Sequence, residues 1–217
     1  MYFKWYQMVK DLIIGFEEFR NSFFEEDKRL YEKLVREGQK PKTMVIACSD
    51  SRVDPMILFG SKPGDLFVIR NVANLVPSYQ PDKSNDSTSA ALEFAVLKLQ
   101  VEHIIVLGHS YCGGIRAACS HLLGEQKRES EFITSWVEIA SPAVESVANI
   151  NPQNGITRLV EQASIINSIK NLLTFPWIRS AVSDKKLKVH GWWFDIEEGT
   201  LWVNKNGKKD FQKLSPV

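Results

Sequence analysis

The stretch HIIVLGHSYCGG, residues 103–114, predicts a strand, a turn and the start of a helix in one continuous run. Its first residues are largely branched and apolar, as in a strand that is buried within a parallel sheet. Gly113 and Gly114 then open a segment with helical spacing that extends to about residue 123. His109 and Cys112 lie in the turn between them. The stretch therefore predicts a β–α unit with two candidate metal ligands at the carboxyl end of its strand.

Two earlier segments have the same order of an apolar strand followed by polar residues. MVIA at 44–47 ends at CSDSR, residues 48–52, and LFVI at 66–69 ends at RNVAN, residues 70–74. Parallel strands bring their carboxyl ends to one edge of a sheet, and α/β proteins bind their ligands at that edge. We therefore expect the polar residues after all three strands to lie close together.

The rest of the chain predicts helices around this sheet. The spacing of apolar residues indicates one or two amphipathic helices within residues 6–37, a helix from Asp86 or Ser87 to about residue 99, and helices near 131–148 and 153–182. Residues 77–89 have the composition of a loop, and strands at 187–193 and 201–203 are joined by a turn. The predicted fold class is α/β, with a mostly parallel central sheet flanked by helices, an N-terminal helical arm (1–37) and a C-terminal antiparallel edge strand or hairpin. We expect one domain over residues 1–217.

The composition restricts the class of protein. There are 27 Lys and Arg against 26 Asp and Glu, for a net charge of +1, so no nucleic-acid partner is expected. No run approaches the roughly 18 apolar residues of a membrane span, and the first residues do not resemble a signal peptide. Three cysteines, an odd number, favour a reducing compartment with metal-binding or free thiols. We therefore expect a cytoplasmic protein without a membrane partner that acts on a small molecule.

Cys48, His109 and Cys112 are the most informative side chains. Two thiolates and one imidazole form a ligand set that zinc favours, and three protein ligands leave a fourth position for water, as in catalytic zinc sites. The spacing of His109 and Cys112 would be weak evidence by itself, and so would Cys48 alone, but all three residues fall at predicted strand ends on one edge of the sheet. Cys119 instead lies inside the following helix and is expected to pack in the core. The sequence therefore predicts a Zn²⁺ site.

Asp50 and Arg52 follow Cys48 closely. A carboxylate at this position could contact the metal or a water on it, and the arginine could hold that carboxylate by paired hydrogen bonds. The alternative is an ion pair that only fixes the turn.

These segments resemble the β-class carbonic anhydrases, particularly the plant-type branch. The matching pieces are CSDSR at 48–52, RNVAN at 70–74, SAALEFAVLKL at 89–99 and HIIVLGHSYCGG at 103–114. The resemblance implies a carbonate dehydratase, a lyase that reversibly hydrates CO2 to bicarbonate and a proton. It implies that zinc is bound by Cys48, His109 and Cys112, and that Asp50 and Arg52 form a catalytic dyad. It also implies a homodimer embraced by the N-terminal helices, and such dimers can pair into tetramers.

The resemblance further indicates the surroundings of the substrate. The expected pocket comprises Gln39, Phe67, Val72, Phe94, Gly113 and Gly114. Phe94 stands where the family usually has tyrosine. Gln39 is expected to reach the pocket across the dimer interface, and backbone N–H groups near the two glycines are expected to steady bicarbonate.

The mechanistic hypothesis has zinc-bound hydroxide attack CO2 while Asp50 accepts its hydrogen bond and Arg52 keeps Asp50 ionised. In a closed form, Asp50 would itself fill the fourth zinc position. Two alternatives remain open: a CS2 or COS hydrolase on the same scaffold, and a non-catalytic binding protein stabilised by zinc. The non-catalytic protein requires four protein ligands and no exchangeable water.

Overall fold

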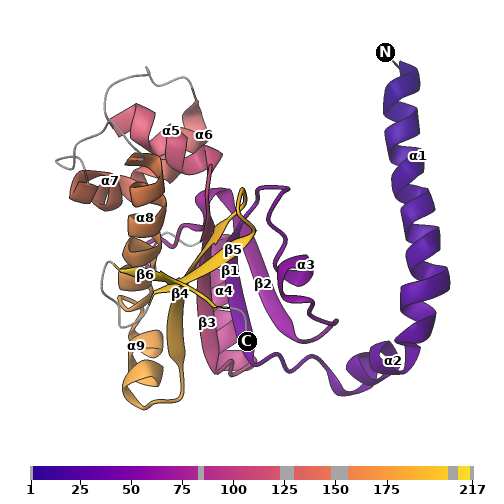
Figure 1. Ribbon diagram of the computed structural model, residues 1–217. Coiled ribbons are helices and arrows are strands. Elements are labelled where there is room, and N and C mark those ends of the chain that lie inside the picture. Colours follow the sequence, from indigo (N-terminus) through magenta and orange to yellow (C-terminus); the bar gives the residue numbers. More distant parts are fainter. Residues whose placement is uncertain (1, 83–85, 123–129, 148–155, 205–209, 216–217) are drawn as a thin grey trace. The chain divides into compact units, whose positions relative to one another are not determined.

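The computed structural model describes residues 2–82, 86–122, 130–147, 156–204 and 210–215 (Figure 1). The chain divides into two compact units, Met1–Gln39 and Lys40–Val217. Within the described part of the chain, no helix has both the length and the hydropathy of a transmembrane span.

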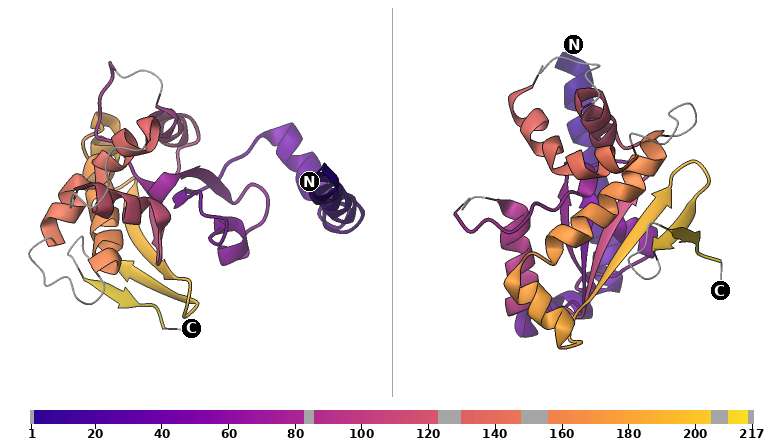
Figure 2. Two further views of the ribbon diagram at one scale, coloured as in Figure 1. Left: turned by 90° about the horizontal axis from the view of Figure 1, so that it is seen from above. Right: turned by 90° about the vertical axis from the view of Figure 1, so that its left-hand side faces the viewer.

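The second unit is built on a six-stranded sheet with the order β2-β1-β3-β4-β5-β6. Its parallel strands are β2 (Leu66–Asn71), β1 (Thr43–Cys48), β3 (His103–His109) and β4 (Lys188–Asp195). The antiparallel strands β5 (Thr200–Asn204) and β6 (Phe211–Lys213) continue from β4, and they are drawn in yellow in Figure 2. The predicted fold class is confirmed, and β6 is a strand that the sequence pattern did not predict.

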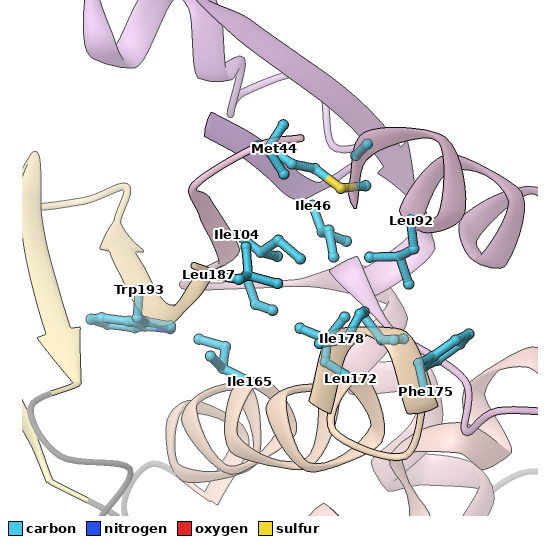
Figure 3. Packing of buried hydrophobic residues seen from close by; sticks show 14 residues of the cluster. Met44, Ile46, Leu92, Ile104, Ile165, Leu172, Phe175, Ile178, Leu187 and Trp193 are labelled. Carbon is cyan, nitrogen blue, oxygen red and sulfur yellow. The ribbon is translucent and has the colours of Figure 1, made fainter. Parts of the chain in front are cut away.

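The main hydrophobic core lies between this sheet and three helices, α4 (Ser87–Glu93), α8 (Ile156–Leu172) and α9 (Pro176–Ser183). In the right-hand view of Figure 2, α8 and α9 lie across the front of the sheet. Figure 3 shows Met44 and Ile46 of β1 and Ile104 of β3 directed toward the helical side chains. Each of these three residues is 0% exposed, because a parallel sheet covered by helices buries its central strands.

Shorter helices lie near the carboxyl ends of the parallel strands. They are α5 (Gly113–Leu122), α6 (Glu131–Val137) and α7 (Ser141–Val147), whereas α3 (Pro55–Phe59) packs against a separate cluster of β1 and β3 side chains. Figure 1 shows α5, α6 and α7 grouped at one end of the sheet. They enclose a second hydrophobic cluster that includes Cys48, Cys112 and Cys119. The predicted ligand cysteines therefore lie in an apolar environment.

Helix boundaries depend on local residues that can be identified in the sequence. The helix predicted for 153–182 is two helices, because Pro176 cannot continue α8 and instead occupies the first turn of α9. The helix predicted for 131–148 is likewise divided into α6 and α7, and residues 148–155 lie outside the described residues. The Asp86 carboxylate caps α4 by accepting the N–H groups of Thr88 and Ser89 at 3.1 and 2.9 Å. The predicted loop at 77–89 ends where α4 begins, and its residues 83–85 are not described.

The first unit is helical throughout most of its length. It contains α1 (Tyr2–Phe19), a π-helical turn (Arg20–Phe24) and α2 (Lys28–Glu37), as predicted for residues 6–37. Several of its large apolar side chains are exposed, including Leu12 at 73% and Phe16 at 62%.

Candidate metal centre

The carboxyl ends of β1 and β3 bring the three predicted zinc ligands together. Cys48 ends β1, His109 ends β3, and Cys112 directly precedes α5. Their ligand atoms lie within 4.8 Å of one another, and the two sulfur atoms are 4.0 Å apart. All three residues are at most 5% exposed. The set is positioned for zinc binding.

His109 directs an unpaired nitrogen into this cluster. Its Nδ1 lies 2.9 Å from the carbonyl oxygen of Ser110, to which it donates a hydrogen bond. The neutral ring therefore keeps its lone pair on Nε2. Among the described residues, that buried Nε2 has no hydrogen-bond partner. A buried acceptor without a partner is costly, and coordination to a metal would satisfy it.

The two ligand thiols require a cation if both are to ionise. The hydrogen bond from Cys112 lowers the pKa of Cys48 to about 4, whereas the same contact and burial raise the pKa of Cys112. The two thiols thus share one proton, because a second thiolate at 4.0 Å would be repelled by the first. A divalent cation removes that repulsion, and zinc prefers this combination of sulfur and nitrogen ligands. The residues therefore fit zinc.

Asp50 and Arg52 form a bidentate ion pair beside these ligands. Arg52 Nε and Nη2 donate to Asp50 Oδ1 and Oδ2 at 2.9 and 2.7 Å. The Arg52 guanidinium holds the pKa of the Asp50 carboxyl well below its usual range, so this carboxylate is ionised. Asp50 Oδ2 lies 4.0 Å from His109 Nε2. In the open form of the site, the fourth zinc position is left to water and Asp50 stays away from the metal. A carboxylate that is paired with arginine, as Asp50 is here, has the arrangement that this open form requires.

Val72 and Gly114, two of the predicted pocket residues, lie beside the metal ligands. A Cβ atom on Gly114 would be 2.7 Å from Val72 Cγ1, so α5 approaches this valine closely because residue 114 has no side chain. Val72 packs against the hydrophobic cluster that contains Cys48 and Cys112. A Cβ on Gly113 would meet nothing within 4 Å. At the amino end of α5, the space beside Gly114 is therefore too small for a side chain, whereas the space beside Gly113 is open.

The predicted pocket residues Phe67 and Phe94 lie elsewhere in the same chain. Their rings stack with centroids 5.9 Å apart. Phe67 pairs with Met44 of β1, whereas Asn71 pairs with Cys48, a separation of about 13 Å along the strand. A single chain therefore does not bring these rings to its own metal ligands. Gln39 belongs to the first unit.

Comparison with known proteins agrees with the chemistry of this site. The family model described as carbonic anhydrase matches residues 43–201. The chain is 35% identical over 200 residues to beta carbonic anhydrase 3 of Arabidopsis thaliana, covering 89% of this chain and 76% of that protein. The chain belongs to the β-class carbonic anhydrases. This carbonic anhydrase is also 40% identical over 197 residues to the mitochondrial beta carbonic anhydrase 6 of the same plant, with 85% and 66% of the two chains covered.

Solved structures of other β-carbonic anhydrases have the same fold. That of CcaA has a TM-score of 0.86 and 33% sequence identity, covering 97% of this chain and 93% of CcaA. One from the ascomycete Sordaria macrospora, described as tetrameric, has a TM-score of 0.79 and 29% identity, covering 91% and 96%. Membership of this family makes the chain a carbonate dehydratase that hydrates CO2, and its Cys-His-Cys site is typical of the zinc sites in this class.

Sequence reasoning missed Glu161, which lies directly behind one zinc ligand of the carbonic anhydrase. This residue is 3% exposed. Its two carboxyl oxygens accept the Cys112 backbone N–H at 3.0 Å and the Trp193 indole N–H at 3.2 Å. Burial raises the pKa of Glu161 to about 7. An acidic residue in an amphipathic helix usually faces solvent, so the helical pattern of residues 156–172 contains no signal for this role.

Arg70, from the RNVAN segment, fastens the loop that carries Cys48 and Asp50 in this carbonic anhydrase. Its Nε donates to the Cys48 carbonyl at 2.9 Å, and its Nη1 donates to the Asp54 carboxylate at 2.9 Å. Its Nη2 donates to the carbonyl oxygens of Asp50 and Val53 at 2.7 and 3.0 Å. One guanidinium therefore organises the whole turn after β1.

Replacing Arg70 with methionine should destabilise the enzyme. Methionine keeps much of the apolar stem but removes the guanidinium donor from three carbonyl oxygens and from the Asp54 carboxylate. The Asp50 carbonyl keeps the Val53 N–H, and the Asp54 carboxylate keeps the N–H groups of Met56 and Ile57. We expect the free energy of unfolding, measured by urea denaturation of the zinc-loaded protein, to fall by about 2–4 kcal/mol. Arg179→Met, at an exposed position of α9, is the control and should change it by less than about 0.5 kcal/mol. Equal effects of the two substitutions would contradict this role of Arg70.

Proposed function

We propose that this β-carbonic anhydrase hydrates CO2 in the open form of its site, with zinc held by Cys48, His109 and Cys112. The observation that carries this proposal is the bidentate pairing of Asp50 with Arg52 beside the ligand cluster. When bound, zinc acidifies a water molecule and supplies the nucleophile for CO2 hydration. Three protein ligands leave room for that water, whereas a structural zinc site would use four.

Asp50 supplies the acceptor that orients the nucleophile. An ionised carboxylate only accepts hydrogen bonds, so it fixes the direction of the nucleophile's proton and thereby of its lone pair. Arg52 keeps Asp50 ionised and sets the plane of its carboxylate through two parallel hydrogen bonds. Backbone N–H groups at the amino end of α5, at Gly113 and Gly114, are suited to stabilising the anionic product.

The functional unit is a homodimer in this proposal. Phe67 and Phe94 lie too far along the sheet to reach the metal ligands of their own chain, and Phe94 is 47% exposed. Together with Gln39, these two rings would complete the CO2 pocket of a partner chain. The exposed apolar side chains of α1 support packing against that partner. Pairing of two dimers into a tetramer and a cytoplasmic location stay predictions.

The mass of the active species tests this assembly. We expect sedimentation at micromolar concentration to give at least twice the chain mass of 24.7 kDa. Dilution that produces monomers should also abolish turnover, because each pocket would lose the residues of its partner. A fully active species of 24.7 kDa would contradict the shared pocket.

Stopped-flow CO2 hydration with parallel zinc analysis tests the activity itself. Protein with one zinc per chain should reach a kcat/KM of roughly 10⁶–10⁸ M⁻¹s⁻¹. Removal of zinc with dipicolinate should abolish turnover, and added zinc should restore it. COS hydrolysis is measured in parallel, since faster turnover of COS would favour the hydrolase alternative. Dimeric, zinc-replete protein that is inert at neutral and alkaline pH would overturn the proposal.

A further inference from the structure

Tyr111, which lies between the zinc ligands His109 and Cys112, adopts an unusual backbone conformation. Its φ is +59°, in the left-handed region that bulky L-residues rarely occupy. Its side chain is mostly in solvent, with 62% of the residue exposed. Core packing therefore does not hold Tyr111 in this conformation, and other contacts must stabilise it.

The left-handed turn directs the Tyr111 carbonyl oxygen toward Arg52. This oxygen accepts a hydrogen bond from Arg52 Nη2 at 3.1 Å. The same nitrogen donates to Asp50 Oδ2 at 2.7 Å. A single guanidinium nitrogen therefore links the turn between two zinc ligands to the carboxylate that orients the nucleophile.

Hydrogen bonds to the end of β4 and to the residues directly after it hold this turn at Ser110 and Tyr111. Ser110 is held through its backbone N–H, which donates to the Phe194 carbonyl at 2.9 Å, and through its Oγ, which accepts the Ile196 N–H at 2.8 Å. Tyr111 is held through its phenol, which donates to Glu197 Oε2 at 2.6 Å. A bond to a carboxylate is stronger than one between neutral groups, so it can offset the backbone strain.

We propose that the Tyr111–Glu197 hydrogen bond positions Arg52, and through it Asp50, for CO2 hydration. With the bond in place, the turn keeps its carbonyl on Arg52 Nη2 and the guanidinium keeps its orientation toward Asp50. Without it, Tyr111 relaxes toward negative φ, its carbonyl turns away, and Asp50 is held less firmly in the open arrangement. Tyr111 and Glu197 are positioning residues, because they act through Arg52. This inference rests on the role proposed above for Asp50.

A double-mutant cycle in stopped-flow CO2 hydration tests the bond. Tyr111→Phe and Glu197→Ala should each lower kcat by about 5- to 20-fold with unchanged zinc content and a KM within about twofold of wild type. The double variant should be no slower than the slower single variant, because each substitution removes the same bond. Glu197→Gln retains an acceptor oxygen and should recover to within about threefold of wild type.

Glu198→Ala is the matched control. It removes a neighbouring carboxylate that lies 3.6 Å from Lys213 Nζ, and its kcat should stay within about twofold of wild type. Independent effects of Tyr111→Phe and Glu197→Ala that multiply in the double variant would overturn the inference. Loss of activity in Glu198→Ala equal to that in Glu197→Ala would also overturn it, since charge rather than the bond would then be responsible.

A second measurement, hydrogen exchange of the Arg52 guanidinium, reports directly on the group that Tyr111 is proposed to position. The Arg52 Nε–H donates to Asp50 Oδ1 at 2.9 Å, so its exchange with solvent is slowed, and ¹⁵N NMR can measure the rate. Exchange should be at least about fivefold faster in Tyr111→Phe and Glu197→Ala and unchanged in Glu198→Ala. If Tyr111→Phe shows unchanged exchange and normal kcat while Asp50→Asn is inactive, the inference about the Tyr111–Glu197 bond is wrong but the proposed role of Asp50 stands. High activity in Asp50→Asn would instead overturn the proposed role of Asp50.

Discussion

Replacing Cys48 or Cys112 with serine is expected to remove the zinc and abolish CO2 hydration. A serine hydroxyl is neutral at physiological pH and is a far poorer zinc ligand than a thiolate. Each variant also leaves one thiolate and His109 Nε2 to bind the cation alone, since the ligand atoms form a group of three. We expect less than about 0.1 zinc per chain and a loss of turnover of at least about 10⁴-fold. Metal analysis of the purified variants and stopped-flow assays measure both quantities.

Cys119→Ala is the matched control for these variants. Cys119 is also buried, at 7% exposure, and packs in the same hydrophobic cluster as the two ligand cysteines. Its replacement should cost about 1 kcal/mol of stability but should leave the zinc content unchanged and kcat within about twofold. A Cys48→Ser protein with stoichiometric zinc and normal turnover would contradict the assigned ligand set. Loss of zinc from Cys119→Ala would show that core packing alone controls metal retention.

The sheet and the metal ligands could be predicted because short-range patterns determine them. Each of the runs at 44–47, 66–69 and 104–107 is continuously apolar, as is typical of a strand covered on both faces. Parallel pairing of β1 with β3 then brings Cys48 and His109 together although they are distant in the sequence. No knowledge of side-chain packing is needed for this step, because the topology of a parallel sheet fixes where its strands end.

Side-chain contacts between residues that are distant in the sequence could not be predicted in this way. Tyr111 and Glu197 are 86 positions apart, and nothing in either neighbourhood specifies the other. The hydrogen bond between the Glu161 carboxylate and the Cys112 N–H likewise has no signal in the sequence of α8. The division at Pro176, in contrast, could have been predicted, since proline within a helical pattern usually ends the helix.

Asp50→Asn is expected to retain zinc and to lose at least about 100-fold in kcat. Asparagine has nearly the same shape as aspartate, so the turn after β1 should persist. Its amide has one acceptor oxygen and one donor nitrogen. Arg52 donates from both Nε and Nη2, so the amide can satisfy only one of these donors and loses the charge that strengthens both bonds. The remaining group also cannot accept the nucleophile's proton with the strength of a carboxylate.

Stability and metal content distinguish this catalytic loss from misfolding. Asp184→Asn, which removes an exposed carboxylate 3.5 Å from Lys186 Nζ, is the control and should keep kcat within about twofold. The unfolding free energy of Asp50→Asn should fall by no more than about 1–2 kcal/mol, and its zinc content should stay at one per chain. A zinc-loaded Asp50→Asn enzyme that keeps most of its turnover would show that the Asp50–Arg52 pair only fixes the turn. Orientation of the nucleophile would then have to come from another acceptor, so the proposed mechanism depends on this one carboxylate.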